Sequence, residues 1–479
     1  MEAVLLTIVQ TINSYLSNYV LIILLVAMGL FFTIRTRGVQ FRCFGEGMRR
    51  VFGGFSLHGG KHHGGISSFQ ALATAVAAQV GTGNIVGACG AILIGGPGAI
   101  FWMWLIAILG MATNYAEAVM AQKTRHVDDD GRVHGGPVYY IRTAFKGAGG
   151  KFLAGFFSVA IILALGFMGS MVQSNSIAAT MNTAFGIPTW IMGLVVVLIG
   201  GFIFIGGVTR IAAVTEKLVP IMALLYIVGS LVVLVMNWQN IIPAFELIFT
   251  CAFNPQASVG GVTFGIIAAL SQGAKRGLFS NEAGMGSTPH AHAMAKVKDP
   301  HDQGVVAMIG VFIDTIVVVS MTALVVISVL YCGNGPMTVD ATGAAAGLDK
   351  TNMAQAAFGA FFGEGFGSAF VAICLLFFAF STIIGWNLFA RINVEYLFGK
   401  KGVMPFFVIA LIFIFMGSLL SNDLVWELAD MFNQLMVIPN AIALFALSGA
   451  VASCAKAHHG GKEAKARIAA EEAEEEAQA

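Results

Sequence analysis

Charged side chains are scarce in this sequence. Asp, Glu, Lys and Arg make up only 11% of its 479 residues, whereas hydrophobic residues make up 57% and the mean hydropathy is +0.82. A soluble domain carries about 25% charged residues, so we expect most of this surface to face lipid. The net charge of +1 carries little information, because the positions of the charges matter more than their sum.

Signatures of metal, disulfide and nucleotide chemistry are absent as well. No GxxxxGKS/T loop occurs, so nothing predicts ATP binding. The cysteines show no CxxC spacing and predict neither a metal site nor a disulfide framework. The histidines at 58, 62 and 63, and the pair His290 and His292, have no clear third ligand at the usual spacing. We therefore expect no cofactor. The six cysteines are Cys43, Cys89, Cys251, Cys332, Cys374 and Cys454.

The two ends of the sequence differ from its apolar body. Glu2 occupies the place of a basic n-region and no early cleavage site follows, so no signal peptide is predicted. Residues 2–16 are expected to form a short amphipathic lead-in. From Lys456 onward the chain is rich in Ala, Glu and Lys without an apolar face, which predicts a solvated helix or a disordered tail.

Hydrophobic runs predict eleven membrane-spanning helices, since a bilayer core of about 30 Å needs roughly 20 helical residues to cross. With the N-terminus outside, all of the 26 Lys and Arg residues except Lys275, Arg276 and Lys350 fall on the cytoplasmic side. This agrees with the positive-inside rule, so we expect a multi-pass protein of the cell membrane with a cytoplasmic C-terminus. The predicted spans are residues 17–35, 66–95, 98–122, 152–180, 190–207, 216–236, 262–294, 304–331, 364–390, 403–421 and 424–454.

Two of these spans are interrupted by small and polar residues. One interruption reads QVGTGN at 79–84 and the other SNEAGMG at 280–286. Such breaks free backbone N–H and C=O groups at mid-depth, and they survive only where they are buried or line a water-filled site. A pair of broken helices in the two halves of a chain points to the binding site of a transporter. The alternative is that these glycines only pack helices together.

The breaks also divide the chain. When the first span is set aside, the remaining ten form two fives, and each five begins with a broken span. The first five enters from the cytoplasm and the second from outside, which is the pattern of an inverted repeat. We expect an all-α integral membrane protein with an extra helix and basic loop in 1–62, a first repeat in 63–236, its inverted partner in 237–454 and a charged cytoplasmic tail in 455–479.

Several motifs resemble those of the alanine-or-glycine:cation symporter family, also called the sodium:alanine symporters. The longest is GGPGAIFWMWL at 95–105, closed by Gly110. The others are GNI at 83–85, HGGPVYYI at 134–141, RGLFSNEAGMGS at 276–287 and STIIGW at 381–386. The His/Gly stretch at 58–65 and the acidic tail are not typical of the family. The resemblance implies a LeuT-like fold of five plus five helices with one extra N-terminal helix, and secondary transport of small neutral amino acids with Na⁺.

An amino acid is a zwitterion, and both breaks offer partners for it. The second half-helix of the first break begins near Gly83, and its N–H groups and positive dipole end suit a carboxylate. Carbonyls between Phe279 and Glu282 are expected to accept from the ammonium. Gln173 is implied as a further contact, with a helix-to-helix hydrogen bond as the alternative. The predicted substrate-binding residues are Gly81, Thr82, Gly83, Asn84, Gln173, Phe279, Ser280, Asn281, Thr382 and Trp386.

Two of these side chains are aromatic. Phe279 and Trp386 are expected to wall a pocket for a small side chain, with ordinary core packing as the alternative. Such a pocket would favour Gly, Ala or Ser, because rejecting larger side chains requires a steric conflict.

Sodium prefers oxygen ligands. Span 9 offers the hydroxyls of Ser381 and Thr382, and span 2 offers carbonyls near Val80 and Gly83. The resemblance places Na⁺ between these two spans. The alternative is that both hydroxyls bond back to their own helix, as is common in membrane proteins.

Three acidic residues, Glu117, Glu282 and Asp314, are predicted within the spans. An ionisable group at that depth is a functional-site hypothesis that requires a partner. Asp314 and Glu282 are expected to pair with Lys275 or Arg276 of span 7. The alternative is that Asp314 or Glu282 carries a proton during transport.

Together these features predict a Na⁺-coupled symporter that moves alanine, glycine or similar small neutral amino acids into the cell by alternating access. No enzyme activity and no nucleic-acid partner are expected. The alternatives are H⁺ coupling, a larger neutral substrate such as glutamine, and more remotely a membrane-embedded enzyme or a channel. The sequence does not predict the oligomeric state.

Overall fold

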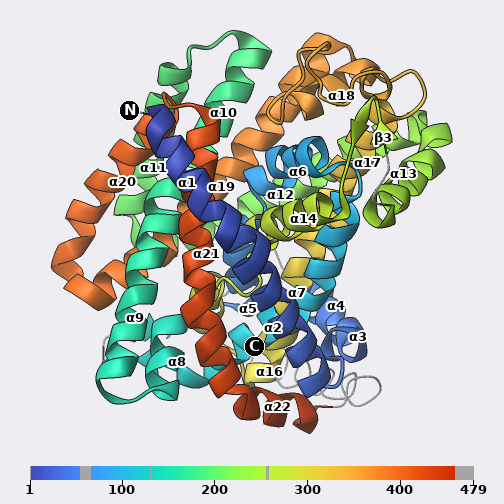
Figure 1. Ribbon diagram of the computed structural model, residues 1–479. Coiled ribbons are helices and arrows are strands. Elements are labelled where there is room, and N and C mark those ends of the chain that lie inside the picture. The colour runs from blue at the N-terminus through green and yellow to red at the C-terminus, as the bar shows by residue number, and fades with distance from the viewer. Residues whose placement is uncertain (1, 54–65, 130, 255–257, 459–479) are drawn as a thin grey trace.

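The structure is a computed structural model that describes residues 2–53, 66–129, 131–254 and 258–458. Nearly all of this chain is helical, and the helices stand side by side in one bundle (Figure 1). Two short antiparallel hairpins pair β1 (His126–Val127) with β2 (Val133–His134) and β3 (Ser258–Val259) with β4 (Val262–Thr263). The His/Gly stretch at 58–65 and the tail beyond 458 lie outside the described residues.

Short π-helical and 3₁₀ segments, labelled η, interrupt several of the helices. In chain order the helical elements are α1 (Glu2–Tyr15), η1 (Leu16–Leu21), α2 (Ile22–Arg35), α3 (Val39–Arg42), α4 (Phe44–Phe52), α5 (Ser68–Gln79), η2 (Gly83–Gly87), α6 (Ala88–Gly95), α7 (Ala99–Thr124), α8 (Pro137–Ala144), α9 (Gly147–Ile161), η3 (Ile162–Gly169), α10 (Ser170–Phe185), α11 (Thr189–Ile205), α12 (Gly207–Met236), η4 (Trp238–Asn240), α13 (Ile241–Phe253), α14 (Ile266–Asn281), α15 (Pro289–Met294), α16 (Pro300–Val311), η5 (Phe312–Val319), α17 (Ser320–Val326), η6 (Ile327–Tyr331), η7 (Pro336–Thr338), α18 (Met353–Phe362), α19 (Glu364–Phe398), η8 (Lys400–Gly402), α20 (Val403–Gly417), α21 (Asn422–Ala446) and α22 (Ser448–Ala457).

Eight helices of the described chain are long and apolar enough to cross a membrane, or nine if a bent pair counts as one span. The bent pair is Ser68–Gln79 with Gly83–Gly95, which meet at 49°. The predicted count of eleven spans is therefore not confirmed. α11 is apolar but only 17 residues long, and the residues predicted as the seventh span divide into α14 and α15. The predicted lead-in at 2–16 is not a separate segment, because α1 runs through η1 into α2 and the three form one apolar helix, Val4–Arg35.

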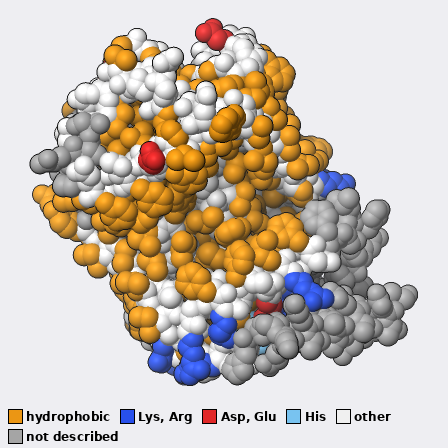
Figure 2. All heavy atoms as spheres, turned by 90° about the vertical axis from the view of Figure 1, so that its right-hand side faces the viewer, with side chains coloured by type: hydrophobic (Ala, Val, Ile, Leu, Met, Phe, Trp, Pro, Cys, Tyr) orange, Lys and Arg blue, Asp and Glu red, His pale blue; other side chains and the backbone are white. Residues whose placement is uncertain are grey.

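The outer surface has the pattern of a membrane protein. Figure 2 shows one face of the bundle, on which hydrophobic side chains cover most of the described surface and most of the visible Lys and Arg side chains gather at the lower end. Large apolar residues such as Phe202, Leu224 and Val235 are exposed. Exposure of this kind is expected where the solvent is lipid rather than water.

Small residues allow the central helices to approach closely, as is usual in membrane proteins. α7 packs against both α14 and α16, and Gly273 of α14 lies so near that an added Cβ would be 2.5 Å from Trp102 Cβ. Gly98, just before α7, sits directly on the backbone of Cys251 and Ala252 in α13. The long GGPGAIFWMWL motif is therefore a packing surface that positions α7.

We expect Gly98→Ala to destabilise the protein by about 1–3 kcal/mol, the usual cost of overpacking a core. Its φ of −61° suits any residue, so the loss would come from the collision with α13. The measurement is the thermal unfolding midpoint in detergent. Gly149→Ala in α9 is the matched control, because an added Cβ there meets nothing within 4 Å. Equal midpoints for the two variants would contradict the close contact.

Candidate functional site

The first broken helix has its freed backbone groups satisfied by side chains. α5 stops at Gln79, and Val80 is extended with ψ of 93° before the chain becomes helical again at Gly83. The Gly81 N–H donates to Asn84 Oδ1 at 2.8 Å, and the Thr82 N–H donates to Gln173 Oε1 at 3.1 Å. All of these residues are buried, so the break depends on such partners.

The second broken helix is built around a carboxylate. α14 ends at Asn281, and the N–H groups of Gly284 and Gly286 donate to the two oxygens of Glu117 at 3.1 and 2.9 Å. Both glycines have positive φ, 91° and 81°, which few other residues tolerate. Asn440 on α21 donates to the same carboxylate at 2.7 Å. Glu117 of α7 therefore holds the non-helical segment in place.

One residue of the second break is held in a strained backbone conformation. Glu282 has φ of +59°, the left-handed region that non-glycine residues rarely adopt. Its carboxylate accepts hydrogen bonds from Trp386 Nε1 and Ser287 Oγ. Conformations of this kind cluster at functional sites, where the surroundings hold them.

The two breaks are in direct contact with each other. A Cβ added to Gly83 would lie 3.0 Å from Ser280 Cα and 3.2 Å from the ring of Phe279. The Gln79 amide donates to the carbonyl of Asn281 at 2.7 Å. Segments about half a chain apart therefore meet at one point, and Gly83 is small because the other broken helix passes beside it.

Asp314, fully buried in η5, lies between the two breaks. Its carboxylate accepts from Asn84 Nδ2 at 2.6 Å on one side and from Ser280 Oγ at 2.7 Å on the other. Thr315 Oγ1 adds a third hydrogen bond at 2.8 Å. The carboxylate thus ties together the first break, the second break and η5.

The predicted pairing of Asp314 and Glu282 with Lys275 or Arg276 is wrong. Both cations bind Asp430 of α21, Lys275 Nζ at 2.8 Å and Arg276 Nη2 at 3.0 Å. They lie about one helical turn before Ser280, where α21 approaches α14, whereas Asp314 is level with Ser280. Within the described residues, the hydrogen bonds to the two acids come from neutral donors.

A cluster of oxygen atoms joins the first broken helix to α19. Thr382 Oγ1 is 3.0 Å from the carbonyl of Ala77 and 3.3 Å from that of Val80. Ser381 Oγ is 3.3 Å from the Ala77 carbonyl, and both hydroxyls also contact the carbonyl of Phe378, at 2.8 Å for Ser381 and 3.0 Å for Thr382. The bonding of both hydroxyls back to their own helix, which is the alternative to an ion site, therefore occurs together with contacts across to α5.

The carbonyl partners in this cluster differ from those predicted. Val80 is present, but Gly83 is not, because its carbonyl accepts the N–H of Ala88 inside the following helix. The carbonyls of Ala77 and Phe378 were missed. Main-chain oxygens carry no residue-type signature, so only the bend of the helix reveals them.

Two buried donors beside the first break have no hydrogen-bond partner in the described part of the chain. They are Gln173 Nε2 and Thr82 Oγ1. Leaving a buried polar group unsatisfied costs about 1–3 kcal/mol. An added Cβ on Gly81 would collide with Thr382 Oγ1 and lie 3.1 Å from Gln173 Oε1, so the Thr382 hydroxyl and the Gln173 amide both lie close to this glycine.

Three aromatic rings enclose the site on another side. The rings of Phe279 and Trp386 meet edge to face with centroids 5.7 Å apart, and Phe279 lies 4.7 Å from Trp426. Trp426 of α21 was not predicted, because no motif surrounds it. The Arg276 guanidinium sits over its ring at 4.5 Å, which connects the aromatic wall to the ion pairs of α14 and α21.

The structure thus brings the ten predicted substrate residues into one buried region. His290 and His292, for which no metal site was predicted, bond to other polar groups. His290 contacts the Ser287 carbonyl at 2.7 Å and Asn393 at 2.9 Å, and His292 contacts Gln303 at 2.8 Å.

Solved structures with a similar fold are membrane transporters. The chain is similar to MhsT, solved in complex with L-phenylalanine, with a TM-score of 0.56 at 13% identity over 82% of this chain and 100% of that one. It is also similar to a Na⁺-coupled sialic acid symporter, with a TM-score of 0.51 at 12% identity over 84% and 82% of the two chains. At such low identity the likeness establishes the fold, which is LeuT-like.

Sequence relatives are much closer. The chain is 42% identical to the sodium/alanine symporter AgcS of Methanococcus maripaludis, over 94% of this chain and 96% of that protein. It is 40% identical to a putative sodium/proton-dependent alanine carrier, YrbD, of Bacillus subtilis, over 92% and 90%. It is 37% identical to the probable sodium/glutamine symporter GlnT of the same organism, over 95% and 91%.

The family model for the sodium:alanine symporter family matches residues 1–472. This match covers the motifs, both breaks and the oxygen cluster described above. The chain is a membrane transporter and not an enzyme, and it belongs to the sodium:alanine symporter family.

Proposed function

We propose that the protein couples the entry of Na⁺ to the uptake of alanine, glycine or a similar small neutral amino acid. The observation that carries this proposal is the contact between two broken helices, with unsatisfied donors on one side and a cluster of oxygens on the other. The proposal keeps the expected orientation, with the N-terminus outside and the C-terminus in the cytoplasm of a cell-membrane protein. It also keeps the two repeats, 63–236 and 237–454.

The substrate carboxylate would bind at the first break. Thr82 Oγ1 and Gln173 Nε2 are buried donors without a partner in the described residues, and a carboxylate supplies acceptors for both. The ammonium would bind at the end of α14, where Phe279 and Ser280 belong to the last turn and the dipole is negative. Phe279, Trp386 and Trp426 would then limit the size of the side chain.

The sodium ion would bind between α5 and α19. The cluster offers five oxygens, because the carbonyls of Ala77, Val80 and Phe378 each lie within 3.3 Å of the hydroxyl of Ser381 or Thr382. Hard cations take oxygen ligands of this kind. One charge moving through 100 mV supplies about 2.3 kcal/mol. At about 1.4 kcal/mol per decade, that supports a gradient of roughly 40-fold in a neutral substrate.

Alternating access would follow from this placement. The ion would draw on oxygens of both α5 and α19, and the substrate on both broken helices. Binding of the ion would therefore favour the conformation in which α5 lies against α19, and binding of the substrate would favour the conformation in which the two broken helices touch. H⁺ is the second candidate for the coupling ion, because the carboxyl group of Asp314 lies between the two breaks.

We expect purified protein in proteoliposomes to accumulate labelled L-alanine above equilibrium under an inward Na⁺ gradient, and not under an equal K⁺ gradient. Vesicles without protein are the control. Equal accumulation in both conditions would overturn the Na⁺ assignment, and accumulation that follows an imposed pH gradient instead would assign the role to H⁺. Folded protein that takes up no alanine would overturn the substrate, and a competition panel that includes glutamine would follow.

We expect Thr382→Val to raise the Na⁺ concentration for half-maximal uptake about tenfold or more, which corresponds to at least about 1.4 kcal/mol. Valine keeps the shape but removes an oxygen from the cluster. Thr74→Val is the matched control, because Thr74 is an equally buried threonine of α5 whose hydroxyl bonds to the Gln70 carbonyl at 2.8 Å. The same Na⁺ dependence in both variants would contradict the ion site.

We expect Phe279→Ala to shift the preference from alanine towards glutamine by about tenfold, because pocket contacts discriminate side chains by about 1–3 kcal/mol. The measurement is inhibition of labelled alanine uptake by either amino acid. Phe362→Ala is the control, since Phe362 packs with Phe358, Phe366 and Phe370 in a separate aromatic cluster. An unchanged ratio in Phe279→Ala would show that its ring does not bound the pocket.

A further inference from the structure

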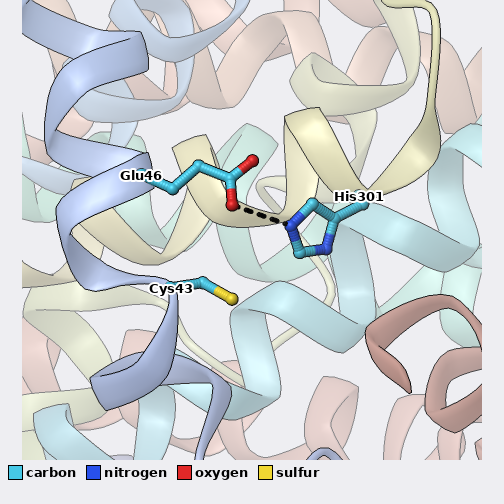
Figure 3. A group of neighbouring side chains, drawn as sticks. All are labelled: Cys43, Glu46 and His301. Carbon is cyan, nitrogen blue, oxygen red and sulfur yellow. Dashed lines mark hydrogen bonds and ion pairs between the residues drawn. The ribbon is translucent and has the colours of Figure 1, made fainter. Parts of the chain in front are cut away.

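Three side chains of types that can bind a metal come together where α3, α4 and α16 meet. Figure 3 shows Cys43 and Glu46 approaching His301, each from a different helix turn. Cys43 lies between α3 and α4, Glu46 in the first turn of α4, and His301 in the first turn of α16. Their sulfur, oxygen and nitrogen ligand atoms all lie within 4.8 Å of one another, and all three residues are buried. The sequence separation of Glu46 and His301 is 255 residues, so no spacing motif reveals the cluster.

The spacing of these atoms suits a tetrahedral metal better than a hydrogen bond. His301 Nε2 and Glu46 Oε2 are 3.4 Å apart, longer than the usual range of about 2.7–3.2 Å for N–H···O. Zinc bonds of about 2.0–2.3 Å in a tetrahedron place neighbouring ligands roughly 3.3–3.8 Å apart. The observed separation therefore matches one edge of such a site.

The other nitrogen of His301 is already held. Nδ1 lies 2.8 Å from the hydroxyl of Tyr115 on α7. A metal-binding histidine usually has its second nitrogen bonded to a neighbouring group, which fixes the ring and directs the first nitrogen to the metal. Tyr115 thus orients Nε2 towards Glu46 and Cys43.

Arg50 lies beside Glu46 and balances the charge of its carboxylate, but it does not explain why Cys43 and His301 lie at the same place. Arg50 Nε is 3.4 Å from Glu46 Oε1, and Arg50 Nη2 is 2.8 Å from Asp302. The other oxygen of the same carboxylate, Glu46 Oε2, faces His301 Nε2. A salt bridge to Arg50 does not explain why the sulfur of Cys43 lies beside these groups, whereas a bound metal ion with a thiolate ligand does.

We propose that Cys43, Glu46 and His301 bind Zn²⁺. Thiolate and imidazole ligands select zinc over the hard cations Mg²⁺ and Ca²⁺, which take oxygen. Three protein ligands leave the fourth position for water. This site is separate from the proposed substrate and sodium sites and does not rest on them.

The metal would fasten α4 to α16. The two helices are already closely packed, since a Cβ added to Gly47 would lie 2.7 Å from both Ile309 Cγ1 and the Val305 carbonyl. α16 continues into η5, which carries Asp314. Zinc would therefore hold the N-terminal helices against the element that connects to both breaks.

A second group of ligand atoms lies next to this site and serves as its control. Asp299, Cys454 and His458 also come together, but two of the three are only partly buried. The rings of His301 and His458 stack with centroids 4.1 Å apart. Cys454 is buried like Cys43, so the two cysteines form a matched pair for substitution.

The experiment uses Co²⁺ as a spectroscopic probe on the full-length protein, purified in detergent after treatment with a chelator. We expect one equivalent of Co²⁺ to produce the near-ultraviolet absorption of a thiolate–cobalt bond, and Zn²⁺ to abolish it by displacement. Cys43→Ala should lose this absorption and Cys454→Ala should keep it. Glu46→Gln should keep the absorption but weaken Co²⁺ binding at least tenfold, which covers the case in which Cys43→Ala does not fold.

Three results would overturn the proposal. One is folded wild-type protein that shows no thiolate–cobalt absorption. Another is absorption that survives in folded Cys43→Ala but disappears in Cys454→Ala, which would place the metal at the neighbouring group. The third is unchanged Co²⁺ affinity in Glu46→Gln. Gel filtration of each variant establishes that it is folded.

Discussion

Backbone groups released inside a bilayer have no water to bond with, and this constraint organises the centre of the molecule. Each break is satisfied by side chains from elsewhere in the chain, Gln173 for the first and Glu117 for the second. Polar residues on α7 and α10 are therefore required by the bends in α5 and α14. A helix broken to expose its main chain is possible only where neighbouring helices carry the complementary groups.

The same constraint separates the buried charges near the breaks into two systems. Glu117 and Asp314 accept hydrogen bonds from neutral donors and hold the breaks together. Lys275 and Arg276 pair instead with Asp430, between α14 and α21. Among the residues that the structure describes, no ammonium or guanidinium is paired with Glu117 or Asp314, so these carboxylates can attract a cationic group.

A feature of this site can be predicted from the sequence only where it requires particular residue types. Gly81, Gly83 and Asn84 stand out in an apolar span, and so the breaks and their meeting were predictable. The carbonyls of Ala77 and Phe378 and the ring of Trp426 have no such signature. The partners of Lys275 and Arg276 depend on how α14 packs against α21. The count of eleven spans is not confirmed at α14, which ends at the second break beside the candidate site, nor at α11, which is apolar but only 17 residues long.

The oxygen cluster between α5 and α19 has a property that concerns leakage. Ser381 and Thr382 donate to the very carbonyls that a cation would engage. When no ion is bound, the hydroxyl hydrogens can bond to these carbonyls, so no chain of water molecules is needed to satisfy the main chain. A cell that stores energy as an ion gradient loses it through any hydrated path. If Na⁺ binds here as proposed, these hydrogen bonds would hold the two helices together while no ion is bound, and less of the ion gradient would leak away between rounds of transport.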